Sequence, residues 1–116
     1  MRRFVAKTKY VHFSPYKLRL IVNAIRGKDA VYALNVLKTA ACRRAVPVRK
    51  MIESAVANAK YLRNVDADKL IIKDLRVDQG PMFRYYKPGA MGRSTIQRKR
   101  LSHLRVILES IDDKEV

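Results

Sequence analysis

The sequence predicts an α+β fold, with three helices packed on one face of a small three-stranded antiparallel sheet and a long β-hairpin projecting from it. The first observation is the order of hydrophobic periodicities, which runs strand, three helices, then two strands. The second is a positively charged excursion between the last two strands. With 116 residues the chain has room for a single domain, 1–116. We expect its globular part at about 5–79 and 101–109, the hairpin at about 80–100 and an acidic tail at 110–116.

The first strand and the first helix are expected between residues 5 and 27. Val5–Phe13 is rich in β-branched and aromatic residues, which favour a strand. Ser14 suits the N-cap of the helix that follows, and Pro15 suits its first position. An apolar stripe then follows at helical spacing, formed by Leu18, Ile21, Val22 and Ile25. Gly27 indicates where this helix ends.

Two further helices are expected before the chain returns to strands. Asp29 can cap the second helix, which places Ala30, Leu34 and Leu37 on one face. The third helix should begin near Ala45 and end near Asn64, because Pro47 is tolerated only in a first helical turn. The apolar positions of the third helix are Val48, Ile52, Ala55, Val56, Ala59 and Leu62.

The last two strands are expected at Leu70–Asp78 and Leu101–Glu109. In the first of them Ile71, Leu75 and Val77 should share one side, and in the second Leu104, Val106 and Leu108 should face inward. The simplest shape for the segment Gly80–Arg100 between these strands is a hairpin. Two arms of about ten residues would reach on the order of 30 Å. A two-stranded ribbon is marginal in water, so this hairpin needs support from a partner.

Positive charge is concentrated in two segments that contain no acidic residue. The chain carries 26 Lys plus Arg against 10 Asp plus Glu, a net charge of +16. Residues 1–28 and 81–105 together hold Arg2, Arg3, Lys7, Lys9, Lys17, Arg19, Arg26, Lys28, Arg84, Lys87, Arg93, Arg98, Lys99, Arg100 and Arg105. A solubilising surface would mix the two signs of charge. The sequence therefore predicts a nucleic-acid partner.

Motifs for catalysis, metal binding and membrane insertion are missing from the sequence. Cys42 is the single cysteine, no Cys/His cluster has zinc spacing, and neither a Gly-rich phosphate loop nor paired acids occur. His12 and His103 are in principle able to act as bases, but they fit a sheet residue and an RNA contact better. We expect no catalytic residue, no metal, no cofactor, no membrane segment, no secretory signal and no homo-oligomer.

Two short motifs in the hairpin have more than one interpretation. In Phe83–Lys87 the cations suit phosphates, whereas each ring could stack on an unpaired base or could simply favour a strand. The run Arg98-Lys99-Arg100 could be a localisation signal, a solvated run or a set of phosphate contacts. Its place at the base of the hairpin favours phosphate contacts.

Several motifs, in order and at the right spacing, resemble the family of large-subunit ribosomal protein twenty-two. They are Ser14–Ile21 with Ile25–Lys28, Ser54–Ala59, Asp78–Pro81, Ala90–Arg93 and Ser102–Leu104, within a match from about Lys9 to Leu108. The chain departs from the family at Tyr16, where Arg is frequent, at Gly89, where the tip usually has another Arg, and at Leu101, where Thr is usual.

The resemblance implies a structural protein of the large ribosomal subunit, in the cytoplasm or in an organelle. Its implied partners are large-subunit rRNA, neighbouring ribosomal proteins and the nascent peptide, because the family's hairpin lines the exit tunnel. The implied RNA-binding residues are Ser14, Lys17, Arg19, Arg26, Lys28, Arg84, Lys87, Arg93, Arg98, Lys99, Arg100, Ser102 and His103. The implied tunnel tip comprises Pro88, Gly89, Ala90, Met91, Gly92 and Arg93. The rival classes are an architectural DNA-binding protein and a small nucleic-acid enzyme.

Overall fold

The computed structural model describes residues 3–40 and 42–110, so Arg2 and the tail residues 111–116 lie outside it. Its elements are β1 (Arg3–Val11), α1 (Pro15–Ile25), α2 (Ala30–Thr39), α3 (Ala45–Arg63), β2 (Leu70–Pro88) and β3 (Ser94–Ser110), with short 3-10 turns η1 (Ala67–Lys69) and η2 (Ala90–Gly92). The three strands form one antiparallel sheet in the order β1-β3-β2. The predicted α+β fold is confirmed.

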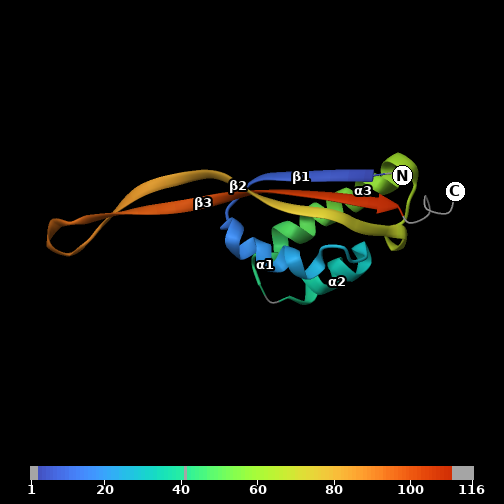
Figure 1. The fold of residues 1–116 in the computed structure, drawn as a ribbon, viewed down its shortest axis with the longest axis horizontal. Helices are drawn as coiled ribbons and strands as arrows, with labels where there is room; N and C mark the ends of the chain where they lie inside the picture. Colours follow the sequence, from blue (N-terminus) through green and yellow to red (C-terminus); the bar gives the residue numbers. More distant parts are fainter. Residues whose placement is uncertain (1–2, 41, 111–116) are drawn as a thin grey trace.

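The molecule is long and narrow because two strands leave the sheet together. Its principal extents are 70, 25 and 19 Å, and Figure 1 shows the helices gathered at one end and a bare two-stranded ribbon at the other. Pairing of β2 with β3 continues from Leu70 opposite Ser110 to Pro88 opposite Ser94. We call the ribbon from Met82 to Arg100 the arm. The arm is therefore an extension of two core strands and not a separate element.

Helix α1 begins and ends where the sequence indicates. Ser14 adopts an extended conformation before Pro15, although its side chain makes no capping hydrogen bond. Leu18, Val22 and Ile25 are fully buried, whereas Ile21 is only partly buried against the same core. Helices pack on this sheet through such stripes, because a helix has one apolar face to bury.

Helix α3 packs beside the sheet but does not bury its last turn as expected. Ile52, Ala55 and Ala59 are fully buried, whereas Leu62 is 64% exposed, so its assignment to the apolar face is wrong. The helix ends at Asn64, whose left-handed φ of 55° allows the Val65 N–H to bond back to the Ala59 carbonyl at 3.4 Å. This cap returns Val65 to the core in place of Leu62.

A bulge in β2 overturns the expected side for Ile71. Ile72 lies opposite Leu108 and Asp74 lies opposite Ile107, so Lys73 is an extra residue in β2. Leu70 and Ile72 face the core before the bulge, and Leu75 and Val77 face it afterwards. Ile71 consequently points to the other side and is only partly buried. A strict period of two cannot reveal one inserted residue.

Ile52 offers a direct test of the packing of α3. Its side chain has no exposed surface, so Ile52→Ala should lower the free energy of unfolding by about 2–5 kcal/mol. Leu20→Ala is the matched control, because Leu20 is 72% exposed on α1 and should change stability little. Urea unfolding of both variants measures the difference. An unchanged midpoint for Ile52→Ala would mean that this face of α3 is misplaced.

Candidate nucleic-acid interface

The arm meets the globular part at a junction that we call the neck: residues 14–16 of the α1 start, 79–81 of β2 and 100–103 of β3. Gln79 pairs with Ser102 and Met82 pairs with Arg100, so Gly80 and Pro81 together oppose the single residue Leu101. This is a second bulge, and a proline without an N–H is tolerated there. A Cβ on Gly80 would lie 3.0 Å from the Leu101 carbonyl oxygen, so close approach of the strands requires glycine.

Ser102 fastens the start of α1 to the neck. Its side chain is fully buried, and its hydroxyl donates a hydrogen bond of 2.7 Å to the Phe13 carbonyl. The hydroxyl is therefore engaged inside the protein. The partly buried Ser14 follows directly, so Ser102 fixes the position of this helix start.

Tyr16 brings two guanidinium groups to one aromatic ring at the neck. The Arg19 guanidinium lies 5.6 Å from the ring centroid and the Arg100 guanidinium lies 5.9 Å from it. Gln79 donates a hydrogen bond of 3.2 Å to the Tyr16 hydroxyl. Distances of this size allow cation–π attraction. The ring therefore links α1, β2 and the base of the arm.

Arg19 of α1 and Arg26, the residue that caps the end of α1, also bind the outer edge of β2, where carbonyls have no neighbouring strand. Arg19 donates to the Val77 carbonyl at 3.1 Å. Arg26 donates to the Leu75 carbonyl from Nε at 3.0 Å and from Nη2 at 2.7 Å. A guanidinium has five N–H donors, so each group retains donors for another ligand. Lys17 and Lys28, the other two cations of this region, are exposed.

His103 is held at the neck by a bulge in β1. Tyr10 has a left-handed φ of 59° and its backbone N–H donates to His103 Nδ1 at 3.1 Å. The two rings meet edge to face, with centroids 5.1 Å apart. Because Nδ1 accepts this bond, the proton of the neutral imidazole resides on Nε2. His103 therefore presents a fixed donor.

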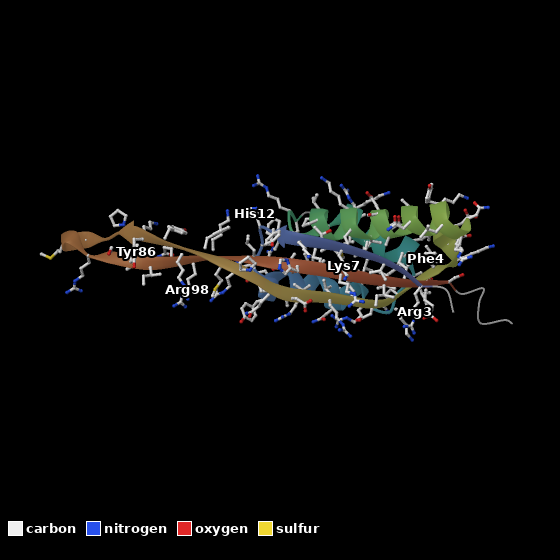
Figure 2. All side chains as sticks on the ribbon, turned by 90° about the horizontal axis from the view of Figure 1, so that it is seen from above. Arg3, Phe4, Lys7, His12, Tyr86 and Arg98 are labelled. Carbon is white, nitrogen blue, oxygen red and sulfur yellow. The ribbon has the colours of Figure 1, made fainter. Side chains whose placement is uncertain are left out.

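The arm has two chemically different faces, because directly opposed residues of antiparallel strands share a face. One face carries Met82, Arg84, Tyr86, Ile96, Arg98 and Arg100, and the other carries Phe83, Tyr85, Lys87, Thr95, Gln97 and Lys99. Arginines thus occupy one face and lysines the other. Arg84 lies directly opposite Arg98, and like charges in such a pair are destabilising. In Figure 2 the side chains of this ribbon, including Tyr86 and Arg98, project with no other element beside them.

The tip of the arm is a compact turn with an apolar end. The Gly89 N–H bonds to the Arg93 carbonyl and the Arg93 N–H bonds to the Ala90 carbonyl. Met91 and Gly92 have φ values of 59° and 74°, in the left-handed region that glycine tolerates best. The Met91 side chain is 98% exposed. The turn expected at Pro88–Arg93 is therefore present, with an exposed methionine at its outermost point.

Two basic residues beside the neck, Arg43 and Arg44, are absent from the RNA-binding set that the sequence analysis gives. A shallow hollow between α1 and the segment before α3 is lined by Phe13, Lys17, Cys42, Arg43 and Arg44. A hydrogen bond with the Arg44 backbone lowers the pKa of the Cys42 thiol, and the Arg44 side chain adds to the effect. The adjacent pair Arg43-Arg44 is the sequence feature that could have indicated this basic group. It lies in a loop, where no helix or strand periodicity predicts which side chains lie together.

Neither a cluster of three possible metal ligands nor a membrane-spanning helix is found in the described residues. Across 3–40 and 42–110 no three His, Cys, Asp or Glu side chains gather as metal ligands. None of the helices in those residues is long and apolar enough to cross a membrane. His12 is exposed directly after the end of β1, and within the described residues it forms no hydrogen bond or ion pair with a carboxylate.

The fold and these surfaces define a class: a small, strongly basic α+β protein with an exposed cationic arm. The chain belongs to the family described as Ribosomal protein L22p/L17e, whose model matches residues 6–109. It is 42% identical over 115 residues to large ribosomal subunit protein uL22 of Desulfitobacterium hafniense (strain Y51), covering 99% of each chain. The uL22 protein of Syntrophotalea carbinolica is 44% identical over 103 residues, 89% of this chain and 94% of that one. The uL22 protein of Aquifex pyrophilus is 43% identical over 105 residues, 90% and 78% respectively. The resemblance inferred from the sequence motifs is confirmed.

The contact between Tyr16 and Arg100 should be measurable as an energetic coupling. Tyr16→Ala, Arg100→Ala and the double variant form a cycle, and we expect a coupling of about 0.5–1 kcal/mol at this exposed site. Tyr16→Phe should retain most of the coupling, because the ring remains. Tyr61, which is 88% exposed on α3, provides the control cycle with Arg100 and should give none. Equal couplings in both cycles would refute the ring contact.

Proposed function

We propose that the chain is a structural, non-catalytic constituent of the large ribosomal subunit that binds large-subunit rRNA and supports subunit assembly. In this proposal the arm helps to line the nascent-peptide exit tunnel. One observation carries it: between Pro81 and Arg100 every side chain is exposed except Gln97, which is partly buried, and no residue is acidic. The names of the relatives as large ribosomal subunit proteins support the same conclusion.

RNA is the partner that best suits the physical properties of the arm. A two-stranded ribbon without a core is marginal in water, and here opposed arginines weaken it further. RNA phosphates neutralise these cations, and unpaired bases offer flat surfaces to Phe83 and Tyr85 on the lysine face. Arginine suits bidentate contact with phosphate, which fits its concentration on one face. Folding of the arm is thus stabilised by its partner.

The residues of the proposed RNA interface fall into three groups. Direct contacts are proposed for the exposed cations and the His103 Nε2–H: Lys17, Lys28, Arg84, Lys87, Arg93, Arg98, Lys99, Arg100 and His103. Arg19 and Arg26 combine a contact from their remaining donors with their bonds to β2. Ser14 and Ser102 are proposed to act mainly by fixing the start of α1 at the neck.

The tip is proposed to face the nascent peptide in the tunnel. Pro88–Arg93 forms a narrow turn, and its outermost side chain is the flexible, apolar Met91. A methionine there can contact many passing sequences without binding any one of them tightly. Neighbouring ribosomal proteins are the other proposed partners, within a ribosome of the cytoplasm or of an organelle.

Salt dependence tests the electrostatic part of the proposal. If about six to ten cations meet phosphates, the log–log slope of rRNA affinity against salt should be steep, roughly −0.7 to −0.9 per phosphate. Changing Arg98, Lys99 and Arg100 together to Ala should reduce the slope by about one for each phosphate that the variant no longer binds. Filter binding to deproteinised large-subunit rRNA measures it.

The matched control removes the same charge from the helices. Lys38, Lys50 and Arg63 are all exposed on α2 and α3, and changing them to Ala should leave the slope close to that of the parent protein. A slope near zero for the parent would contradict electrostatic binding. Tighter binding to duplex DNA than to rRNA would favour the architectural DNA-binding class instead.

Removing the arm should separate docking from lining the tunnel. Residues 83–99 can be replaced by Asn-Gly, which favours a tight hairpin turn, because Met82 and Arg100 are directly opposed. The core of the variant should remain folded, since its buried residues lie outside the deleted segment. We expect the variant to enter large subunits and to change the passage of peptides that stall in the tunnel. Subunit occupancy and stalling are measured in one strain. A folded variant that fails to enter subunits would show that docking needs the arm.

A further inference from the structure

The sheet has a second face, opposite the core helices, that neither the neck nor the arm covers. Figure 2 looks onto this face, with Lys7 near its middle. Phe4 and Ala6 of β1 face the core, so Arg3, Val5 and Lys7 alternate to the open side. On β3 the residues opposite them are Glu109, Ile107 and Arg105. Ile107 and Arg105 are partly buried, whereas Glu109 is buried and lies 3.9 Å from Lys73 Nζ.

Three cations lie side by side across this open face. Arg105 of the central strand is directly opposite Lys7 of β1 and directly opposite Arg76 of β2. Opposed residues share a face and have Cβ atoms about 4.5–5.5 Å apart. Arg76 has a local counter-ion, because its Nε lies 2.7 Å from Asp74 Oδ2. Lys7 and Arg105 have no such ion pair within the described part of the chain, so we call Lys7, Arg105 and Arg76 the cationic row.

One side-chain nitrogen of Arg105 lacks a hydrogen-bond acceptor. Its Nε is shielded from solvent and has no hydrogen-bond partner in the described structure. Arg49 Nε is also shielded and unbonded, but a Glu53 carboxylate lies 3.7 Å away. Buried donors are bonded in most proteins, and an exception calls for an explanation. An anion on the open face would neutralise the charge of the Arg105 guanidinium, whereas the shielded Nε could donate to that anion only after the side chain moves.

The surroundings of the row favour a phosphate group. Lys7 and Arg105 line a shallow hollow together with Lys9, Asp78, His103 and Leu104. His103 contributes a donor there, because its Nδ1 is already bonded to the Tyr10 N–H. Asp78 is the single carboxylate of the hollow and would lie beside the anion. The hollow adjoins the neck through His103, so one RNA segment could pass from the neck onto the sheet.

We propose that the open face of the sheet is a second RNA-binding site, in which Lys7, Arg105 and His103 hold backbone phosphates. The proposal rests on the proposed function in general, but it concerns a surface separate from the arm. The same cations could also receive the acidic residues of a protein, since Val5 and Ile107 flank the row. Phosphate is favoured because the hollow continues from His103 and presents mainly donors.

The first experiment removes the two unpaired cations of the row. Lys7→Gln combined with Arg105→Gln should weaken binding to deproteinised large-subunit rRNA by about tenfold or more, and should reduce the salt slope by about one to two. The melting temperature of the free protein should stay the same or rise, because the variant removes the repulsion between directly opposed like charges. Lower affinity without lower stability is a result that a merely structural role would not give.

Two comparisons make the outcome decisive. Lys50→Gln combined with Arg63→Gln removes the same charge from α3, and an equal loss of affinity in this control would overturn a specific site. The triple Ala variant of Arg98, Lys99 and Arg100 reports on the arm in the same assay. Loss with the triple variant but not with Lys7→Gln/Arg105→Gln would overturn this inference and leave the proposed function standing. Loss with neither would overturn both.

The second experiment identifies what covers the open face in assembled subunits. A benzophenone amino acid replaces Val5, which is 40% exposed beside the row, and purified large subunits are irradiated. A cross-link to rRNA is expected. A cross-link to protein, or none, would overturn the RNA site. The same amino acid at Phe83 tests the arm independently, so failure at Val5 with success at Phe83 concerns the open face only.

Discussion

The continuous pairing of β2 with β3 is the constraint on which the rest of the molecule depends. β2 runs from the sheet to the tip, and β3 runs back from the tip into the sheet. In the sheet their register is fixed by buried residues such as Leu75 opposite Val106. A slip of one residue there would turn every apolar side chain outward, so the core specifies one register strongly. The arm has no buried face of its own and takes its register from the core.

The neck sets the direction in which the arm leaves the sheet. Extra residues in β1 and β2, near Tyr10 and Gly80, change the twist of the strands at the same level of the sheet. Ser102 and Tyr16 then tie the start of α1 to the two arm strands. The cations of α1 and of the arm base consequently belong to one surface, although they are distant in the sequence.

The helices and the hairpin could be predicted because their signals are local. Ser14-Pro15 and Gly27 bracket α1, Pro47 restricts the start of α3, and Gly89 and Gly92 mark the tip. The bulges could not be predicted, since one inserted residue changes strand parity without altering composition. The expected side for Ile71 was wrong for this reason. The tie between Arg26 and the Leu75 carbonyl was also invisible, because carbonyl edges depend on strand order.

The cationic row was hidden from the sequence for a related reason. Lys7, Arg76 and Arg105 belong to three different strands and meet only when the register is known. In the sequence, Lys7 and Arg105 could be recognised only as members of the two basic segments. Arg76 lies in a strand that also contains acidic residues. Site residues could therefore be assigned through the family motifs, but a site formed across strands needed the structure.

Opposed cations on both the arm and the open face bear on how stability and binding are related. Arg84 faces Arg98, and Arg105 faces Lys7 and Arg76. Such pairs lower the stability of the free chain, yet a bound polyanion turns each of them into a shared site for negative charge. A ligand that binds only the folded state stabilises it by mass action, so the same residues weaken the free protein and strengthen the bound one. Added salt screens both effects and moves them in opposite directions, because it relieves the repulsion and weakens the attraction to phosphate. Under the proposed function, the charge pattern is a property of the complex, in which RNA phosphates offset the repulsion between these cations.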